Sequence, residues 1–135
     1  MNEAIKKAIR DKLTGATAVT SLLSASTAVY WGMAGTSAVE PYLVCAYAGG
    51  GAMNDTLTDA QDVTVTVKAV SKVSASQAGA IADAVYNAIH NSELNYDSGW
   101  KHIKVNQTGA FDFVETEERV QYWQAGHIFR VRLSK

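Results

Sequence analysis

The residues of this chain that could do chemistry are three histidines, one cysteine, a glycine run and an acidic cluster. His90, His102 and His127 lie far apart, and none stands at metal-ligand spacing from another histidine or from the cysteine. The sequence therefore predicts no metal centre. His90 falls near the end of a predicted helix, where we interpret it as a favourable partner of the helix dipole.

The cysteine and the glycine run favour structural interpretations. Cys45 lies within an apolar run, whereas a nucleophilic cysteine needs a base and an activating environment, so we expect a small buried hydrophobe. The run Gly49, Gly50 and Gly51 looks like a phosphate-binding loop, but it lacks the lysine and hydroxyl residue that reach phosphate and metal. We interpret it as a hinge or a flexible hairpin tip.

Three acidic residues, Glu115, Glu117 and Glu118, could bind a cation. No aspartate-rich loop with calcium spacing surrounds them, so a solvated strand end is the favoured interpretation. The sequence thus predicts no catalytic residue, no cofactor and no enzymatic activity.

The composition restricts the partners of the chain. Its 135 residues suit one domain, and 12 basic against 13 acidic residues leave a formal net charge of -1. No strong field attracts nucleic acid or an anionic membrane, so nucleic-acid binding is disfavoured as the primary role. We expect neither a membrane nor a sequence-specific nucleic acid as a partner. A single cysteine, no signal-peptide pattern and no run of membrane-spanning length favour a soluble protein made in a reducing cytoplasm.

The N-terminal segment, residues 1–25, has helical spacing. One stripe consists of Ile5, Ala8, Ile9 and Leu13, and Gly15 follows as a stop signal. A second short helix is predicted over residues 17–24. Its inward residues are expected to be Val19, Leu22 and Leu23.

Residues 28–70 predict strands. A brief strand is expected over residues 28–31, and residues 42–48 are apolar on both faces, so this strand needs cover on both sides. The stretch 49–59 reads as a flexible link. Residues 63–68 alternate strictly between valine and polar side chains, which is typical of a half-buried strand.

A long helix is predicted over residues 74–93. Ser74 and Gln77 form a capping box, in which each side chain bonds an otherwise unpaired backbone N–H group. The apolar residues that follow recur at three- and four-residue steps: Ala78, Ile81, Ala82, Val85 and Ile89.

Residues 100–135 predict strands to the end of the chain. Thr108-Gly109 is expected to make a turn, Glu118-Arg119 a second reversal, and Gly126 a bulge. The fold class is therefore α+β: a single domain with a mostly antiparallel β-sheet, one long helix packed on a face, and N-terminal helices.

An interaction surface is the leading functional idea from the residues themselves. Aromatic and arginine side chains are favoured at protein interfaces. Several aromatics fall at strand ends or beside turns, and Arg130 and Arg132 share the outer face of the last strand. These aromatics are Trp31, Tyr42, Trp100, Tyr122 and Trp123.

The layout resembles the tail-completion, or tail-terminator, proteins of long-tailed bacteriophages. The resemblance covers nearly the whole chain. It is carried by Pro41-Tyr42-Leu43-Val44, the alternating residues 63–67, the helix over residues 78–89, and the closing strand over residues 127–133.

The resemblance implies a structural virion protein that assembles as a ring, typically a homohexamer, on the head-proximal end of the tail tube. There it would end tube growth and form the surface that joins the head, with the tail tube protein, the head-tail connector protein and its own copies as partners. Loops 32–40 and 49–59 are expected to order on assembly. The candidate interface residues are Gly49, Gly50, Gly51, Asn54, Asp55, Trp123, Arg130 and Arg132.

Three alternatives remain open at this stage. The chain could be a head-tail adaptor or another connector ring. It could be a small enzyme or ligand-binding domain with a pocket between helix and sheet, although the Ala, Ile and Val side chains of the helix face argue against this. Finally, Lys104, Arg130 and Arg132 could lead a nucleic-acid-binding surface without sequence specificity.

Overall fold

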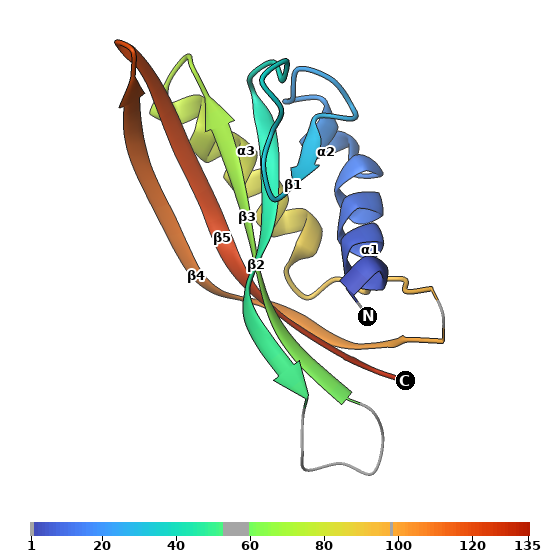
Figure 1. Ribbon diagram of the computed structural model, residues 1–135. Helices are drawn as coiled ribbons and strands as arrows, with labels where there is room; N and C mark the ends of the chain where they lie inside the picture. Colours follow the sequence, from blue (N-terminus) through green and yellow to red (C-terminus); the bar gives the residue numbers. More distant parts are fainter. Residues whose placement is uncertain (1, 53–59, 98) are drawn as a thin grey trace.

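One sheet organises the chain, and the helices lie on one of its faces (Figure 1). The computed structural model describes residues 2–52, 60–97 and 99–135. The helices are α1 (Asn2–Thr14), α2 (Thr17–Thr20) and α3 (Ala75–Ile89). The strands are β1 (Val29–Trp31), β2 (Tyr42–Ala52), β3 (Ala60–Ser71), β4 (Lys101–Glu117) and β5 (Val120–Ser134).

The sheet has the strand order β1-β2-β3-β5-β4. The short β1 pairs in parallel with β2, and every other neighbouring pair is antiparallel. The α+β class, the mostly antiparallel sheet, the long helix on one face and the N-terminal helices are thus confirmed.

The hydrophobic core lies between the helices and the sheet. The predicted stripes of α1 and α3 are buried, and they meet the inward residues of β3 and β5. Those inward residues are Val63, Val65, Val67, Phe129, Val131 and Leu133. Each such side chain contributes roughly 1.5–3 kcal/mol when fully buried, so this interface dominates the stability of the fold.

The start of α3 confirms half of the predicted capping box. Ser74 Oγ accepts a hydrogen bond from the Gln77 backbone N–H at 3.1 Å. The Gln77 side chain does not return to Ser74; its Oε1 accepts from the hydroxyl of Ser71 instead. Ser71 is fully buried, and its Oγ accepts from the N–H groups of Val73 (3.0 Å) and Ser74 (3.4 Å). The last residue of β3 therefore helps to cap the helix.

The α3 helix ends at Ile89, four residues before the predicted limit. Asn91 adopts a left-handed conformation with φ of 56°. Ser92 then donates from its hydroxyl to the Ile89 carbonyl at 2.7 Å, which satisfies one of the helix's terminal carbonyl groups. In α2, Val19 and Leu23 are buried as predicted, but Leu22 is exposed because the helix stops at Thr20 and the chain turns.

The predicted turn at Thr108-Gly109 is wrong, because β4 runs through both residues. The pairing of β4 with β5 shifts register between Gln107 and Gly109, so the extra residue is absorbed as a bulge. Thr108 Oγ1 donates to the Ile128 carbonyl at 3.3 Å. The reversal predicted at Glu118-Arg119 is confirmed, with both residues at positive φ.

The interpretation of the three glycines as a hinge or hairpin tip is also wrong. Gly49, Gly50 and Gly51 lie in β2 and pair with β3. Gly49 and Gly50 have φ of 144° and 142°, and a Cβ on Gly50 would come within 2.6 Å of the Val63 Cα. Glycine is needed here because the strand kinks at a register shift while two backbones approach closely. The remainder of the predicted link, residues 53–59, lies outside the described residues.

Gly126 is not a bulge, because the pairing of β5 with β3 and β4 is regular there. A Cβ at this position would lie 2.3 Å from the Val67 carbonyl oxygen and 2.8 Å from Cζ of Phe111. The glycine therefore permits close packing of neighbouring strands and of the Phe111 ring.

We predict that Gly126→Ala lowers the free energy of unfolding by at least about 1–3 kcal/mol, because the added methyl group must displace backbone atoms. Gly79→Ala is the matched control. Gly79 lies inside α3 and its Cβ would meet nothing within 4 Å, so this change should raise stability by about 0.5–1 kcal/mol. Urea unfolding of both variants measures the difference. Equal stabilities would show that the close strand packing at Gly126 is not a constraint.

Candidate assembly surfaces

The sheet has one face opposite the helices, here called the open face (Figure 1). Partly exposed polar and apolar side chains of β3 and β5 lie on it. Alternation along β3 places Thr64, Thr66 and Lys68 on this face, and all three side chains are partly exposed. Their neighbours in register on β5 are Arg130, Ile128 and Gly126. The apolar residues of β2 were expected to need cover on both sides. Leu43 and Cys45 are fully buried on the helix side, and Val44 is buried on the open face, where Tyr42 and Ala46 remain partly exposed.

An ion pair links two strands on the open face. Arg130 Nε donates to both carboxylate oxygens of Asp62 at 2.9 Å, and an Arg130 terminal nitrogen also bonds this carboxylate. Arg132 Nε lies 3.7 Å from Asp62 Oδ2. The hydrogen bond from Arg130 lowers the pKa of Asp62 below its ordinary value of 3.8. The two arginines predicted to form an interface therefore share one carboxylate, and less positive charge is available for binding nucleic acid.

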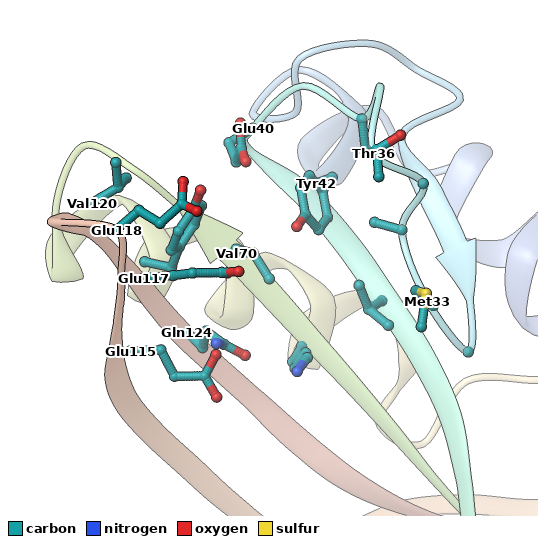
Figure 2. A pocket seen from close by; sticks show the side chains of 17 residues that line it. Met33, Thr36, Glu40, Tyr42, Val70, Glu115, Glu117, Glu118, Val120 and Gln124 are labelled. Carbon is teal, nitrogen blue, oxygen red and sulfur yellow. The ribbon is translucent and has the colours of Figure 1, made fainter.

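A groove of about 570 Å³ lies at one end of the open face (Figure 2). One wall is the loop of residues 32–40 and the other is the end of the β4–β5 hairpin, with Val44, Val70 and Gln124 between them. Gln124 is almost fully buried, and within the described chain its Oε1 has no hydrogen-bond partner. The rim of the groove is acidic, with carboxylates of Glu40, Glu115, Glu117 and Glu118.

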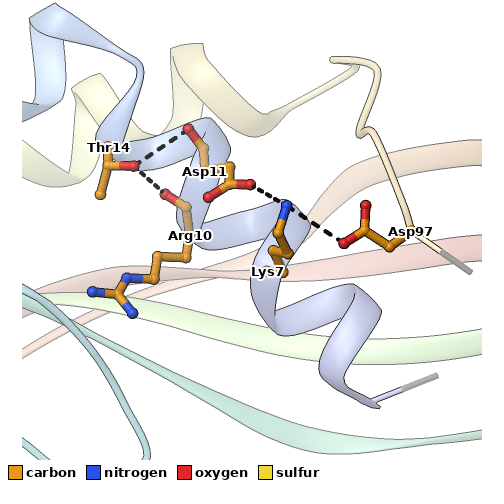
Figure 3. A network of polar contacts seen from close by, with 5 residues as sticks. All are labelled: Lys7, Arg10, Asp11, Thr14 and Asp97. Atoms are coloured by element: carbon orange, nitrogen blue, oxygen red, sulfur yellow. Dashed lines mark hydrogen bonds and ion pairs between the residues drawn. The ribbon is translucent and has the colours of Figure 1, made fainter.

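A second groove lies between α1 and β1. It has a volume of about 400 Å³ and is lined by charged residues of α1 and by Val29, Tyr30 and Trp31. Two of the charged residues that line it also form an ion pair: Lys7 Nζ lies 3.1 Å from Asp11 and, beyond the groove, 3.5 Å from Asp97 (Figure 3). These carboxylates raise the pKa of Lys7, and the hydrogen bond with Asp11 is the largest cause. The Arg10 side chain points away from this network.

The strand edges are a further candidate surface. β4 is an edge strand of 17 residues, and its side chains Ile103, Phe113 and Val114 are exposed. At the other edge, β1 pairs only with residues 43–45 of β2. The rest of β2, residues 46–52, has no second neighbouring strand within the part of the chain that the structure describes.

Trp123 lies on the helix side of β5, where it packs against Ala78, Ala82 and Ala125. It is partly exposed and lines a groove of about 260 Å³ between α3 and β4. This groove has small and apolar walls, with Asp112 as its charged residue. It does not gather the converging polar groups that a ligand pocket between helix and sheet would need.

The residues singled out for chemistry have structural roles. Cys45 is fully buried, and burial raises the pKa of its thiol to about 12, so the reactive thiolate is absent near neutral pH. His127 Nε2 donates to the Ala82 carbonyl at 3.0 Å, and His90 Nδ1 accepts from the Gln107 N–H at 2.9 Å. His102 Nδ1 accepts from the Leu94 N–H at 3.4 Å. Among the described residues no group of three or more His, Cys, Asp or Glu could hold a metal ion.

The predicted interface residues do not form one patch. Gly49, Gly50 and Gly51 lie on the free part of β2, Arg130 and Arg132 on the open face, and Trp123 on the helix side. Asn54 and Asp55 lie outside the described residues. The assignment of these eight residues to an interface therefore stays a prediction.

Comparison with known proteins identifies the family. The family model described as "Tail completion protein gp17" matches residues 7–132 of the 135. The chain belongs to this family. Tail completion proteins are structural and non-enzymatic, so the expectation of no enzymatic activity is confirmed, and the chain is a component of a phage-like virion.

A solved structure shares the fold of this tail completion chain. A protein chain in the virion of a native gene transfer agent particle matches with a TM-score of 0.78. The match covers 99% of this chain and 97% of that chain at 17% sequence identity. A comparison with curated proteins found no match. In the described part of the tail completion chain, no helix is long and apolar enough to cross a membrane.

Sequence reasoning missed the groove on the open face and the groove between α1 and β1 of this tail completion chain. Glu115 and Glu117 stand two residues apart in a strand, which places both on one face, and this spacing was a usable signal. The facing loop of residues 32–40 gave no such signal, because its position over the sheet depends on tertiary contacts. The α1–β1 groove likewise combines segments that are distant in sequence.

We predict that the Asp62–Arg130 pair makes stability depend on pH. The pKa of Asp62 is lowered in the folded state. The stabilisation from this pair is therefore fully present above about pH 3.8 and is lost as the pH falls through the folded-state pKa. Asp62→Asn should therefore lower the free energy of unfolding at about pH 7, and this deficit should be smaller at about pH 3. Urea unfolding at both pH values measures it, with Asp112→Asn on exposed β4 as control. A deficit of Asp62→Asn that is the same at both pH values would contradict this account.

Proposed function

We propose that this tail completion protein forms a closed ring, most simply a hexamer, that caps the head-proximal end of a tail tube. The ring ends tube growth and presents the surface that joins the head-tail connector. Membership of the tail completion family supports this role. So does the fold shared with a protein of a gene transfer agent virion.

The observation that carries the proposal is the long free edge of β4. An edge strand of 17 residues with exposed Ile103, Phe113 and Val114 is a hazard in a free monomer, because its unpaired backbone groups can template pairing with other chains. In an assembly the same edge becomes an interface. The free part of β2 at the opposite side of the sheet offers a complementary partner.

The strand directions agree with such a contact. β2, β3, β5 and β4 alternate in direction across the sheet, so β4 and β2 run antiparallel to each other. A rotation about an axis parallel to the strands relates one copy to the next without changing the strand directions. The β4 edge of one copy can then lie beside the β2 edge of the next copy as an antiparallel pair. Contacts of this head-to-tail kind generate rings when the rotation closes.

Polymerisation of purified tail tube protein tests the function. We predict that adding this protein shortens the tubes and leaves a ring at one tube end in electron micrographs. Ile103→Lys, which places a charge on the β4 edge without touching the core, should cap less well than the wild type. Gly79→Ala should cap like the wild type.

Two results would contradict the proposal. One is a tube-length distribution that does not change at any ratio of the two proteins. The other is a ring that binds connector rings but never tubes, which would favour the head-tail adaptor role instead.

A further inference from the structure

The end of the β4–β5 hairpin, residues 114–120 and here called the hairpin tip, is an exposed acidic projection. Its carboxylates, Glu115, Glu117 and Glu118, are exposed, and within the described residues none of them has an ion-pair partner. Val114 and Val120 beside them are 51% and 38% exposed. The tip also holds one cation, Arg119, against its three carboxylates, so its net charge is negative. A net negative charge beside apolar side chains fits a basic and partly apolar partner.

The groove between α1 and β1 has the complementary character. Its walls hold the aromatic residues Tyr30 and Trp31 together with charged residues of α1. Three of these are cations and two, Glu3 and Asp11, are carboxylates, so positive charge is in excess. The cations are Lys6, Lys7 and Arg10. Lys6 lies 3.3 Å from Glu3, whereas the guanidinium of the exposed Arg10 has no carboxylate partner within the described part of the chain. A guanidinium group binds carboxylates through paired hydrogen bonds, so Arg10 is suited to an acidic partner.

The two surfaces lie at opposite sides of the molecule. The hairpin tip ends the β4 side of the sheet, and α1 packs beside β1 at the other edge (Figure 1). They do not meet within one copy. A contact between the tip of one copy and the groove of another would leave one tip and one groove free, and such a contact can repeat until a ring closes.

We propose that the hairpin tip of one copy docks into the α1–β1 groove of the next copy, with carboxylates of the tip on Arg10 and Lys6. The occupant of the groove is therefore a second copy of this chain. This inference rests on the proposed ring and names the surfaces that build it. It predicts an assembly that weakens as salt is added, because exposed charges carry the contact.

Carbodiimide cross-linking tests the contact directly, since this reagent joins a carboxylate to a neighbouring amine. A mixture of isotopically light and heavy protein distinguishes links between copies from links within one copy. We expect mixed-isotope links between residues 115–118 and Lys6 or Lys7. Links between copies that join other segments and never these two would overturn the proposal, as would the absence of any such link at high concentration.

Charge reversal provides a second test. The tip variant carries Glu117→Lys and Glu118→Lys, and the groove variant carries Lys6→Glu and Arg10→Glu. Each alone should weaken association at least about tenfold in native mass spectrometry. The mixture should assemble again, because every tip then faces a groove of opposite charge. Asp83→Lys, a charge reversal on the exposed side of α3, is the control.

The results separate this inference from the proposed function. Folded variants that assemble like the wild type, or a mixture that fails to recover, would overturn the tip-in-groove contact and leave the capping ring standing. A wild-type protein that forms the cross-link but has no effect on tube length would overturn the capping function and leave the contact standing. Circular dichroism establishes that each variant is folded.

Discussion

The packing of α3 and α1 on one face of the sheet is the constraint on which the rest of the structure depends. β3 and β5 are neighbours, and their alternating residues, such as Val65 and Phe129, all turn toward the helices. With this face buried, the register of the two strands cannot slip by one residue without exposing the core. The tight approach of strands at Gly126 and Gly50 follows from the same arrangement, since side chains there would push the strands apart.

Because the helices cover only one side of the sheet, the other side and the strand edges remain as candidate assembly surfaces. The open face has a groove in which the buried amide oxygen of Gln124 has no hydrogen-bond partner among the described residues, and the β4 edge has exposed apolar side chains. Neither feature improves the stability of an isolated copy. Both are explained if the chain is a building block, as its family indicates, whose edges and grooves are completed by neighbours in the virion. The absence of reactive chemistry at Cys45 agrees with this role.

The sequence predicted the elements whose signal is local. The stripes of α1 and α3, the alternation of β3 and the Ser74 cap depend on nearby residues, and the structure confirms them. The predictions made from Thr108-Gly109 and Gly49 were wrong because such glycines suit a turn and an irregular strand equally well. The pairing of distant strands decides between the two. The sequence also predicted that Arg130 and Arg132 share the outer face of β5. It did not reveal the ion pair of Arg130 with Asp62, because Asp62 lies 68 residues earlier and no local pattern connects the two.

The central claim is that identical copies join through opposite sides of the sheet to form a ring at the tube end. Electron cryomicroscopy of tail tubes capped with this protein tests it most directly. The account predicts a closed ring in which the β4 edge and the hairpin tip of each copy are covered by the next copy. A cap in which the β4 edges and hairpin tips face solvent, or a single copy bound at the tube end, would contradict it.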